Sequence, residues 1–318
     1  MRYMFVILYM FWVGTALAQN YPTRTVTIIV PYPPGGLIDL VARILQPRLQ
    51  VELGQTVVVE NRSGAGGNVG AEAVARATPD GHMVLLGNPS LAISPLIYKQ
   101  LNYRPQEDLA YVGRYGTVPN VLLVSPALPA QSVRELVAHL KSNPGKLNYA
   151  SNGYGTSPQM SMELFKGMTN TFIVHIPFRG SGPAVASLLA GDTQLMFDNL
   201  PPVIPQIKAG KMRALAVTGL KRSSAMPDLP TLDESGLKGY EVTAWFGLNV
   251  AAGTPAEVVG RLNQAMNRAT SDAKTREQLE SRGATVVQET PEAYRSFIQE
   301  ELGKWAPIVK RAAVVAEQ

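Results

Sequence analysis

The sequence predicts an α/β protein built from two lobes. Short runs of β-branched and apolar residues alternate along the chain with segments of helical period, which favours a mainly parallel sheet covered by helices on both faces. Several of the predicted strands end in turns rich in Gly, Pro, Ser, Thr and Asn that lead directly into a helix. The chain of 318 residues is also longer than one hydrophobic core usually organises, so two lobes are expected.

Residues 1–18 have the pattern of a secretory signal peptide. Arg2 supplies a short basic segment, and residues 4–13 are apolar but too few to span a bilayer. Ala16-Leu17-Ala18 fits the small-residue rule for cleavage before Gln19. We therefore expect export to the periplasm and cleavage after Ala18.

The composition excludes several classes of protein. The chain has no Cys, which excludes a disulfide framework, thiol catalysis and lipid attachment through an N-terminal cysteine. It has 29 Lys and Arg and 24 Asp and Glu, and Arg2 is the only charged residue of the leader, so the mature chain keeps a net charge of +4. Because the basic residues are scattered and aromatic residues make up only 7%, we expect no nucleic-acid surface.

The first predicted unit is a strand at residues 25–30, the turn Pro31-Tyr32-Pro33-Pro34-Gly35-Gly36 and a helix from Leu37. The prolines lack a backbone N–H, and the glycines leave room for a ligand to approach the main chain. A helix that begins at such a turn points free N–H groups and its positive dipole end outward, which suits a carboxylate or a phosphate. An ordinary strand-to-helix loop is the alternative interpretation.

A second strand at residues 56–60 leads into a Gly-rich turn at 61–70 and an Ala-rich helix at 71–77. The turn departs from the dinucleotide pattern G-x-G-x-x-G, because Val69 stands where the third glycine belongs. No P-loop pattern occurs in the chain. Further strands are expected at 83–87, around 111–113 and at 120–124, with a loop at 88–90.

The next part of the chain repeats the strand-to-helix pattern. Ser132 and Glu135 form a predicted capping box. The strand at 147–150 leads into the turn 151–158, where Thr156 or Ser157 is expected to cap the next helix. The strands at 172–177 and 195–197 end at Phe178-Arg179-Gly180-Ser181 and at Asp198-Asn199, and two more strands are expected at 212–218 and 241–250.

The last seventy residues are predicted to be helical. Thr254-Pro255-Ala256-Glu257 fits a second capping box, and a final helix is expected to begin near Thr290-Pro291. Both helices carry an apolar stripe of the kind that packs into a core.

The sequence offers no clear catalytic or metal-binding arrangement. A G-x-S-x-G elbow and an H-E-x-x-H motif are absent, and packing or surface roles account for His82, His139 and His175. A hydrolase that uses Ser157 or Ser181 is the alternative. We expect no enzymatic activity, no metal and no cofactor. The polar turns at the strand ends would instead line a crevice where helix N-termini from two lobes face one anion.

Over essentially the whole mature chain, the sequence resembles the tripartite tricarboxylate transporter extracytoplasmic receptors, the Bug-type periplasmic solute-binding proteins. The segments that carry the resemblance are Pro31 to Gly36 with Asp39, Ala42 and Arg43; Glu60-Asn61-Arg62 with Gly64 to Asn68; Ala77 to Gly81; His175 to Gly180; Phe197-Asp198-Asn199; and Ala252 to Pro255. Each segment is weak alone, but their order and spacing together are specific.

The resemblance implies a type II-like periplasmic binding protein fold, with two α/β lobes joined by two crossing strands around a ligand cleft. Lobe 1 would comprise residues 19–122 and 246–318, and lobe 2 residues 123–245. The resemblance also implies a monomer that captures a small di- or aromatic carboxylate and delivers it to membrane permease subunits. A ligand sensor for a signalling partner, using the same cleft, is the alternative.

The resemblance further implies which residues contact the ligand. They are Tyr32, Pro34, Gly35, Gly36, Leu37, Asp39 and Asn68 in lobe 1, and Tyr154, Gly155, Thr156, Ser157, Phe178, Arg179, Asp198 and Asn199 in lobe 2. The alternatives are that Asp39 only complements its helix dipole and that Arg179 is a surface side chain. Asp198 would repel an anion, so we expect it to hold loop amides or a ligand donor. Tyr32 and Leu37 depart from the commoner residues, which suggests an aromatic or more apolar carboxylate.

Overall fold

The computed structural model describes residues 21–316, so the predicted signal peptide lies outside the described residues. The strands are β1 (Val26–Val30), β2 (Val57–Asn61), β3 (Met83–Gly87), β4 (Leu109–Val124), β5 (Asn148–Ser151), β6 (Val174–Pro177), β7 (Leu195–Asn199), β8 (Arg213–Val217), β9 (Thr243–Ala251) and β10 (Thr285–Val286). The helices are α1 (Leu37–Leu53), η1 (Ala65–Gly67), α2 (Asn68–Ala75), α3 (Ser90–Ile97), α4 (Val133–Ser142), α5 (Ser157–Thr169), α6 (Ser181–Ala190), α7 (Leu200–Lys208), α8 (Ala256–Ser271), α9 (Ala273–Glu280) and α10 (Pro291–Ala312). The expected α/β fold class is confirmed.

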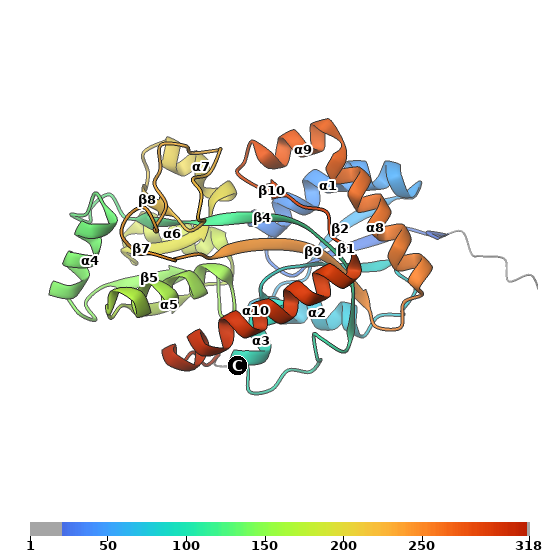
Figure 1. Ribbon diagram of the computed structural model, residues 1–318, viewed down its shortest axis with the longest axis horizontal. Coiled ribbons are helices and arrows are strands. Elements are labelled where there is room, and N and C mark those ends of the chain that lie inside the picture. The colour runs from blue at the N-terminus through green and yellow to red at the C-terminus, as the bar shows by residue number, and fades with distance from the viewer. Residues whose placement is uncertain (1–20, 317–318) are drawn as a thin grey trace, which may run out of the picture.

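Two long antiparallel strands run through the middle of the molecule and connect its two halves (Figure 1). The sheet order is β2-β1-β3-β9-β4-β7-β5-β6, with β8 and β10 also paired to β4. We call β1, β2 and β3 with their helices the first half, and β5 to β8 with theirs the second half. Strands β1, β2 and β3 are parallel to one another, as are β5, β6 and β7.

Strand β4 belongs to both halves. Its residues 109–119 pair with β9, and its residues 120–124 pair with β7 and β8. The two strands predicted near 111–113 and 120–124 are therefore one strand of 16 residues. Glycine at position 116 lets β4 run close beside β9, because a Cβ on this residue would lie 2.2 Å from the Phe246 ring. The prediction of a mainly parallel sheet is correct for the two outer groups and wrong for the centre.

The helix starts were predicted with mixed success. The Ser132 cap is confirmed, because its Oγ accepts a 3.2 Å hydrogen bond from the Glu135 N–H. The second capping box is wrong: Thr254 Oγ1 donates to the Ala251 carbonyl at 2.7 Å instead of capping α8. Helix α3 was not predicted, because only a loop at 88–90 was expected before the strand near 111. Its few polar residues and internal Pro95 conceal the helical period from a sequence pattern.

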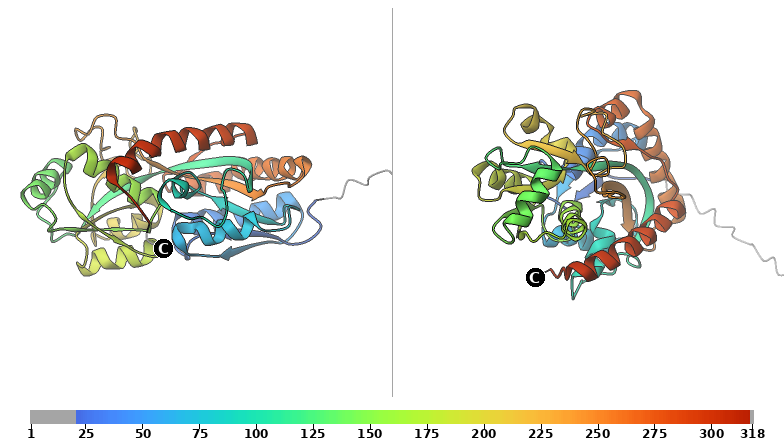
Figure 2. Two further views of the ribbon diagram at one scale, coloured as in Figure 1. Left: turned by 90° about the horizontal axis from the view of Figure 1, so that it is seen from below. Right: turned by 60° about the vertical axis from the view of Figure 1, so that its left-hand side comes forward.

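The C-terminal helix α10 packs on both halves and lies along the long axis of the molecule (Figure 2). Its first turns place Tyr294 and Ile298 in a core with β1, β3 and β9 residues. Its last turns place Trp305 and Val309 in the core of the second half, beside α4 and α5 residues. The predicted apolar stripe of this helix is confirmed as core packing.

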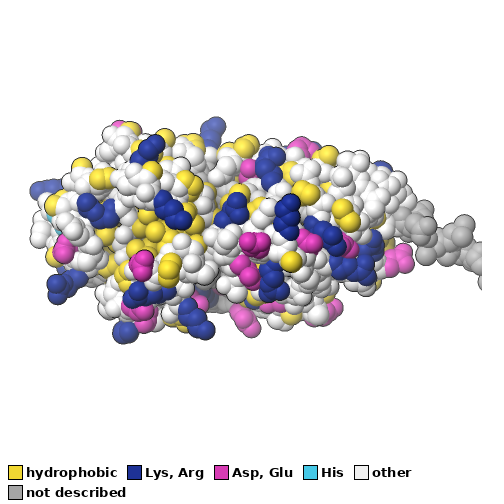
Figure 3. Space-filling view, turned by 90° about the horizontal axis from the view of Figure 1, so that it is seen from above, with side chains coloured by type: hydrophobic (Ala, Val, Ile, Leu, Met, Phe, Trp, Pro, Cys, Tyr) yellow, Lys and Arg dark blue, Asp and Glu magenta, His cyan; other side chains and the backbone are white. Residues whose placement is uncertain are grey.

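The surface of the fold carries charges of both signs. Figure 3 shows Lys and Arg interspersed with Asp and Glu on one face, without a basic stripe there. Among residues 21–316, no helix is both long enough and apolar enough to cross a bilayer.

A buried glutamate joins α10 to the central strands. Glu301 Oε2 accepts from the indole N–H of Trp245 on β9 at 3.2 Å and from that of Trp305 at 3.0 Å. Both indoles are fully buried, so no water replaces this acceptor.

We predict that Glu301→Ala lowers the free energy of unfolding by about 2 to 4 kcal/mol, because it leaves two buried indole donors without an acceptor. Glu301→Gln keeps an acceptor and should lose less. Glu300→Ala changes the neighbouring exposed glutamate and serves as the control. Urea unfolding followed by Trp fluorescence measures the difference, and equal midpoints for Glu301→Ala and Glu300→Ala would refute the role of this carboxylate.

Candidate ligand-binding site

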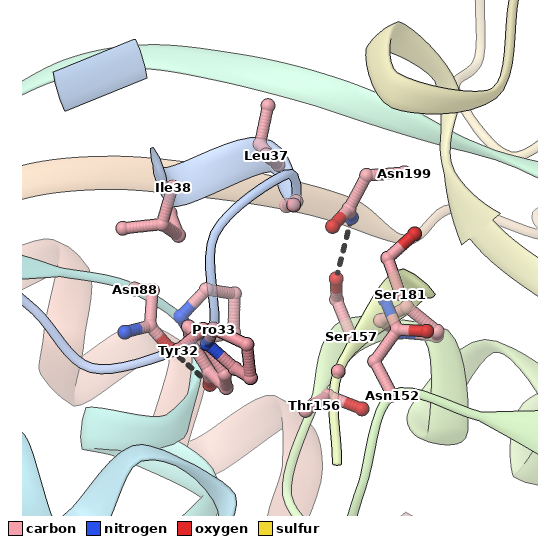
Figure 4. Close-up of a pocket in the computed structure, with 15 residues that line it drawn as sticks. Tyr32, Pro33, Leu37, Ile38, Asn88, Asn152, Thr156, Ser157, Ser181 and Asn199 are labelled. Carbon is pink, nitrogen blue, oxygen red and sulfur yellow. Dashed lines mark hydrogen bonds between the residues drawn. The ribbon is translucent and has the colours of Figure 1, made fainter. Parts of the chain in front are cut away.

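An inner cavity lies where the two halves face each other (Figure 4). It is lined by Tyr32, Pro33, Gly36, Leu37, Ile38, Asn88, Pro89, Asn152, Thr156, Ser157, Pro158, Gly180, Ser181, Asn199 and Ala244. Except for Ala244 on β9 and Asn199, the last residue of β7, these residues come from strand-to-helix turns or from the helix starts that follow them. No Lys, Arg, His, Asp or Glu is among them.

Five helices direct their N-termini toward this cavity. Helices α1 and α3 begin there from the first half, and α5, α6 and α7 begin there from the second. The N–H groups of a first helical turn have no acceptor within their own helix. They carry the positive end of the helix dipole and suit an anion. In α3 the N–H groups of Ser90, Leu91 and Ala92 are already bonded to Asn88 and Pro89, so this helix contributes mainly its dipole. The cavity can therefore hold a carboxylate without a cationic side chain.

The first turn is held in place by Asp39. Its carboxylate accepts from the Gly35 N–H at 3.0 Å, from Arg43 Nε at 3.1 Å and from Asn61 Nδ2 at 3.0 Å. Asn61 also donates to the Tyr32 carbonyl at 2.9 Å, which ties the turn to the end of β2. Burial opposes ionisation, but these hydrogen bonds outweigh it and hold the pKa of Asp39 below its usual value.

The Tyr32 ring lies between the inner cavity and a larger space outside it. Its hydroxyl is 3.0 Å from the Gly66 carbonyl and 2.9 Å from Asn88 Oδ1, and its one proton can be donated to either oxygen. Asn88 Oδ1 also accepts from the Ser90 N–H at 3.1 Å and so orders the start of α3. Burial raises the pKa of Tyr32, so the phenol stays neutral. The hydroxyl is thus used within the first half.

In the second half, amide and hydroxyl groups connect the turns to the central strands. Asn199 Nδ2 donates to Asn120 Oδ1 on β4 at 2.6 Å and to Ser157 Oγ at 3.2 Å. Asn120 Nδ2 donates in turn to Ser161 Oγ at 2.9 Å. Thr156 Oγ1 donates to the Gly153 carbonyl at 2.7 Å, which leaves the α5 N–H groups uncapped. These groups hold the starts of α5 and α7 side by side.

Asp198 lies behind this group and is fully buried. It accepts from Asn152 Nδ2 and from the Asn199 N–H, each at 2.7 Å, and from the Ser181 hydroxyl. Burial raises the pKa of Asp198 to about 6, against the effect of these hydrogen bonds. The carboxylate therefore orders the turns before α6 and α7, as the sequence predicts for it.

An outer chamber adjoins the inner cavity and shares Tyr32, Pro33, Asn152 and Gly180 with it. Its volume is about 760 Å³, against about 40 Å³ for the inner cavity. The first half contributes residues 63–69, Glu72 and 100–103 with Tyr98, and the second half contributes residues 153–154 and 177–179. The chamber is thus also formed between the halves.

The two spaces contain most of the predicted ligand contacts. Tyr32, Gly36, Leu37, Thr156, Ser157 and Asn199 line the inner cavity, and Tyr32, Asn68, Tyr154, Phe178 and Arg179 line the outer chamber. The predicted contacts Pro34, Gly35, Asp39, Gly155 and Asp198 line neither. Pro34 and Gly35 lie exposed on the turn, and the Gly155 N–H donates to Gln159 Oε1 at 2.7 Å within the start of α5.

Several residues that line the inner cavity were not among the predicted ligand contacts. They are Pro33, Ile38, Asn88, Pro89, Asn152, Pro158, Gly180, Ser181 and Ala244. Asn88 and Pro89 follow β3 and could have been found, because β3 is parallel to β1 and ends at the same edge of the sheet. Ala244 carries no local pattern of a binding residue. Only the crossing of β9 brings it to the cavity.

The serines proposed for a hydrolase have no histidine partner. Ser157 Oγ donates to Asn120 Oδ1 at 3.4 Å, and Ser181 Oγ donates to Asp198. His175 lies 2.6 Å from Ser151 Oγ, and burial with nearby Lys166 lowers its pKa to about 4. Within residues 21–316, no group of three His, Cys, Asp or Glu is placed to hold a metal ion.

Comparison with known proteins identifies the family of the chain. The model of the tripartite tricarboxylate transporter family receptor matches residues 41–314. The chain belongs to this family. It is a family of substrate-binding receptors rather than of enzymes, as expected for this chain.

Relatives and solved structures cover nearly the whole chain. Protein BugT of Bordetella pertussis is 39% identical over 295 residues, which is 92% of this chain and 90% of BugT. The structure of the R. palustris protein Rpa4515 with adipate has a TM-score of 0.90 at 35% identity, covering 93% of this chain and 99% of that one. MatC from Rhodopseudomonas palustris with bound malate has a TM-score of 0.86 at 34% identity, covering 91% and 100%. Family members therefore include carboxylate-binding receptors.

Asp198 predicts a pH effect of defined sign. Its pKa rises from 3.8 to about 6 on folding, so the folded state binds the proton more tightly than the unfolded state. The protonated carboxyl of Asp198 therefore stabilises the folded state, and this effect is fully present below the pKa of the unfolded state. The stabilisation, about 3 kcal/mol in total, is lost as the pH rises toward 6. The free energy of unfolding of the native chain should fall relative to that of Asp198→Asn between pH 4 and pH 7.

Urea unfolding of both proteins at several pH values measures this difference. Asp192→Asn, which changes an exposed carboxyl of the same half, is the control and should follow the native chain. A difference between the native chain and Asp198→Asn that is constant from pH 4 to 7 would contradict the shift.

Proposed function

We propose that this protein is a periplasmic receptor that captures a small carboxylate between its two halves and delivers it to the membrane subunits of a tripartite tricarboxylate-type transporter. The proposal rests mainly on one observation. Five helix N-termini face a cavity whose lining has no charged side chain. The helix dipoles and the backbone donors left free at some of these helix starts then balance the anion, and membership of a receptor family supports binding without turnover.

The adipate and malate in the relatives' structures support a di- or hydroxycarboxylate as the ligand class. Leu37 and Ile38 at the start of α1 add apolar surface to the inner cavity, which favours a ligand with an aliphatic or aromatic body. Residues 19–122 with 246–318 and residues 123–245 are the proposed lobes. Residues 1–18 are the proposed signal peptide for export to the periplasm.

The two halves touch through glycines at the edge of the site. A Cβ on Gly66 of η1 would lie 2.2 Å from the Tyr154 carbonyl, and one on Gly180 would lie 3.1 Å from Pro33. Main chain and ring therefore meet across the cleft without room for a side chain at Gly66. This contact supports capture by closure of the halves around the ligand.

We predict that Gly36→Val abolishes carboxylate binding with little loss of stability. Gly36 has an extended backbone (φ −83°, ψ 177°) that valine adopts, and its Cβ would enter open space in the inner cavity. Isothermal titration with adipate and malate measures the loss. We expect affinity to fall at least about tenfold, because the added methyl groups occupy the place of the ligand.

Gly182→Val is the matched control. Gly182 also lies in a first helical turn with open space at its Cβ, but it does not line either cavity. If both variants bind like the native chain, the inner cavity is not the carboxylate site. Uptake of the bound acid by cells with and without the permease distinguishes delivery from a sensing role.

A further inference from the structure

We infer that the far end of the second half is a lipid-binding surface, which holds the protein on a bilayer with anionic headgroups. We call this surface the basic pole and define it as Lys141, Lys146, Met168, Phe172 and Val174. The inference goes beyond ligand capture, because none of these five residues lines the inner cavity or the outer chamber.

Three apolar side chains of the basic pole face solvent. Phe172 is 61% exposed, Met168 is 39% exposed and Val174 is 36% exposed. Val174 begins β6, which is the last strand of the sheet order in this half and pairs with β5. Within residues 21–316, therefore, no further strand covers its free edge. Exposed apolar groups of this kind gain free energy when they enter the boundary between headgroups and acyl chains.

The turn after α4 brings two lysines next to these apolar side chains. The Gly145 N–H donates to the Phe172 carbonyl at 2.9 Å, and a Cβ on Gly145 would lie 2.9 Å from the Phe172 ring. Lys141 lies in the last turn of α4, and Lys146 directly follows Gly145. Both lysines are exposed, and neither forms an ion pair with another residue of the described chain. The basic pole thus combines protruding apolar groups with free positive charge.

The charge of the basic pole has the same sign as that of the half around it. Residues 123–245 contain 11 Lys and Arg and 8 Asp and Glu, so they carry three of the four net positive charges of the mature chain. Segments 141–146 and 167–174 contain two lysines and no acidic residue. The neighbouring Lys166 is balanced by Glu163 at 2.8 Å. An anionic lipid surface is complementary to this charge, and each lysine near it strengthens binding about fivefold.

The size and the place of the basic pole favour a bilayer over a protein partner. The pole offers five side chains, whereas a stable protein interface involves about 20 to 30 residues on each side. Helix α4 lies at the end of the molecule that points away from the first half (Figure 1). Attachment at this end leaves the space between the two halves accessible to a ligand.

The first test measures flotation of the mature chain with vesicles of phosphatidylcholine and phosphatidylglycerol, mixed at about two to one, and with vesicles of phosphatidylcholine alone. We expect binding to the anionic vesicles only, and its loss at high salt. Lys141→Gln combined with Lys146→Gln should weaken this binding at least about tenfold, because two charges leave the surface. Lys208→Gln combined with Lys211→Gln is the matched control. It removes the same charge from two exposed lysines at the end of α7 and should change binding less than about twofold.

The second test reports on the apolar part of the basic pole. Phe172→Trp places an indole there, while the native Trp245 and Trp305 are fully buried and should not respond to vesicles. The emission of Phe172→Trp should shift to shorter wavelength when anionic vesicles are added, because the indole leaves water for the interface. Val51→Trp, at a valine on α1 that is 66% exposed, is the control and should show no shift.

Several results would overturn the inference. Equal binding to both kinds of vesicle, equal losses in the two lysine pairs, or no shift for Phe172→Trp each contradict it. Absence of vesicle binding also contradicts it and leaves a protein partner as the occupant of the basic pole.

Isothermal titration with carboxylates separates this inference from the proposed function. The variant with Lys141→Gln and Lys146→Gln should bind a carboxylate as tightly as the native chain, because the basic pole lies outside both cavities. A native chain that binds anionic vesicles but no carboxylate overturns the proposed function alone. A native chain that binds a carboxylate but no vesicles overturns the lipid-binding surface alone.

Discussion

The proposed site would hold an anion without a cationic side chain, and the rest of the site depends on this constraint. A partial charge at a helix end acts over about one turn and only in the right direction, so the turns that position the helices must be rigid. A long cationic side chain would tolerate small errors of position, whereas these donors do not. Polar groups behind the cavity supply the rigidity, with Asp39 holding the first turn and Asp198 and Asn120 holding those of the second half.

The continuity of the central strands limits how the two halves can move. Strand β4 passes from one half to the other without a loop, and Asn120, which orders the second-half turns, lies where it changes partners. Helix α10 packs on both cores through Tyr294 and Trp305. Opening of the cleft must therefore bend β4 and β9 and slide contacts under α10.

Local sequence was sufficient for features that local physics decides. The turn after β1, the Ser132 cap and the stripe of α10 follow from proline, capping and periodicity within a few residues. Features that depend on partners distant in sequence were not predictable. The continuity of β4 requires β9, and Ala244 reaches the cavity only through this pairing. Thr254 matched a capping pattern, but Pro255 occupies the N-cap of α8 and the Thr254 hydroxyl donates to the Ala251 carbonyl.

A buried carboxylate directly behind an anion site needs a physical reason. Asp198 accepts from Asn152, Ser181 and the Asn199 N–H, so it fixes the direction of groups on three different turns. A neutral acceptor would hold each donor less firmly, because hydrogen bonds to a charged acceptor are about twice as strong. The charge of Asp198 would repel an anionic ligand. Burial also opposes ionisation of this carboxyl, because it raises the pKa to about 6. An anion bound in the proposed site would favour the protonated form further and would thereby couple ligand capture to proton uptake at Asp198.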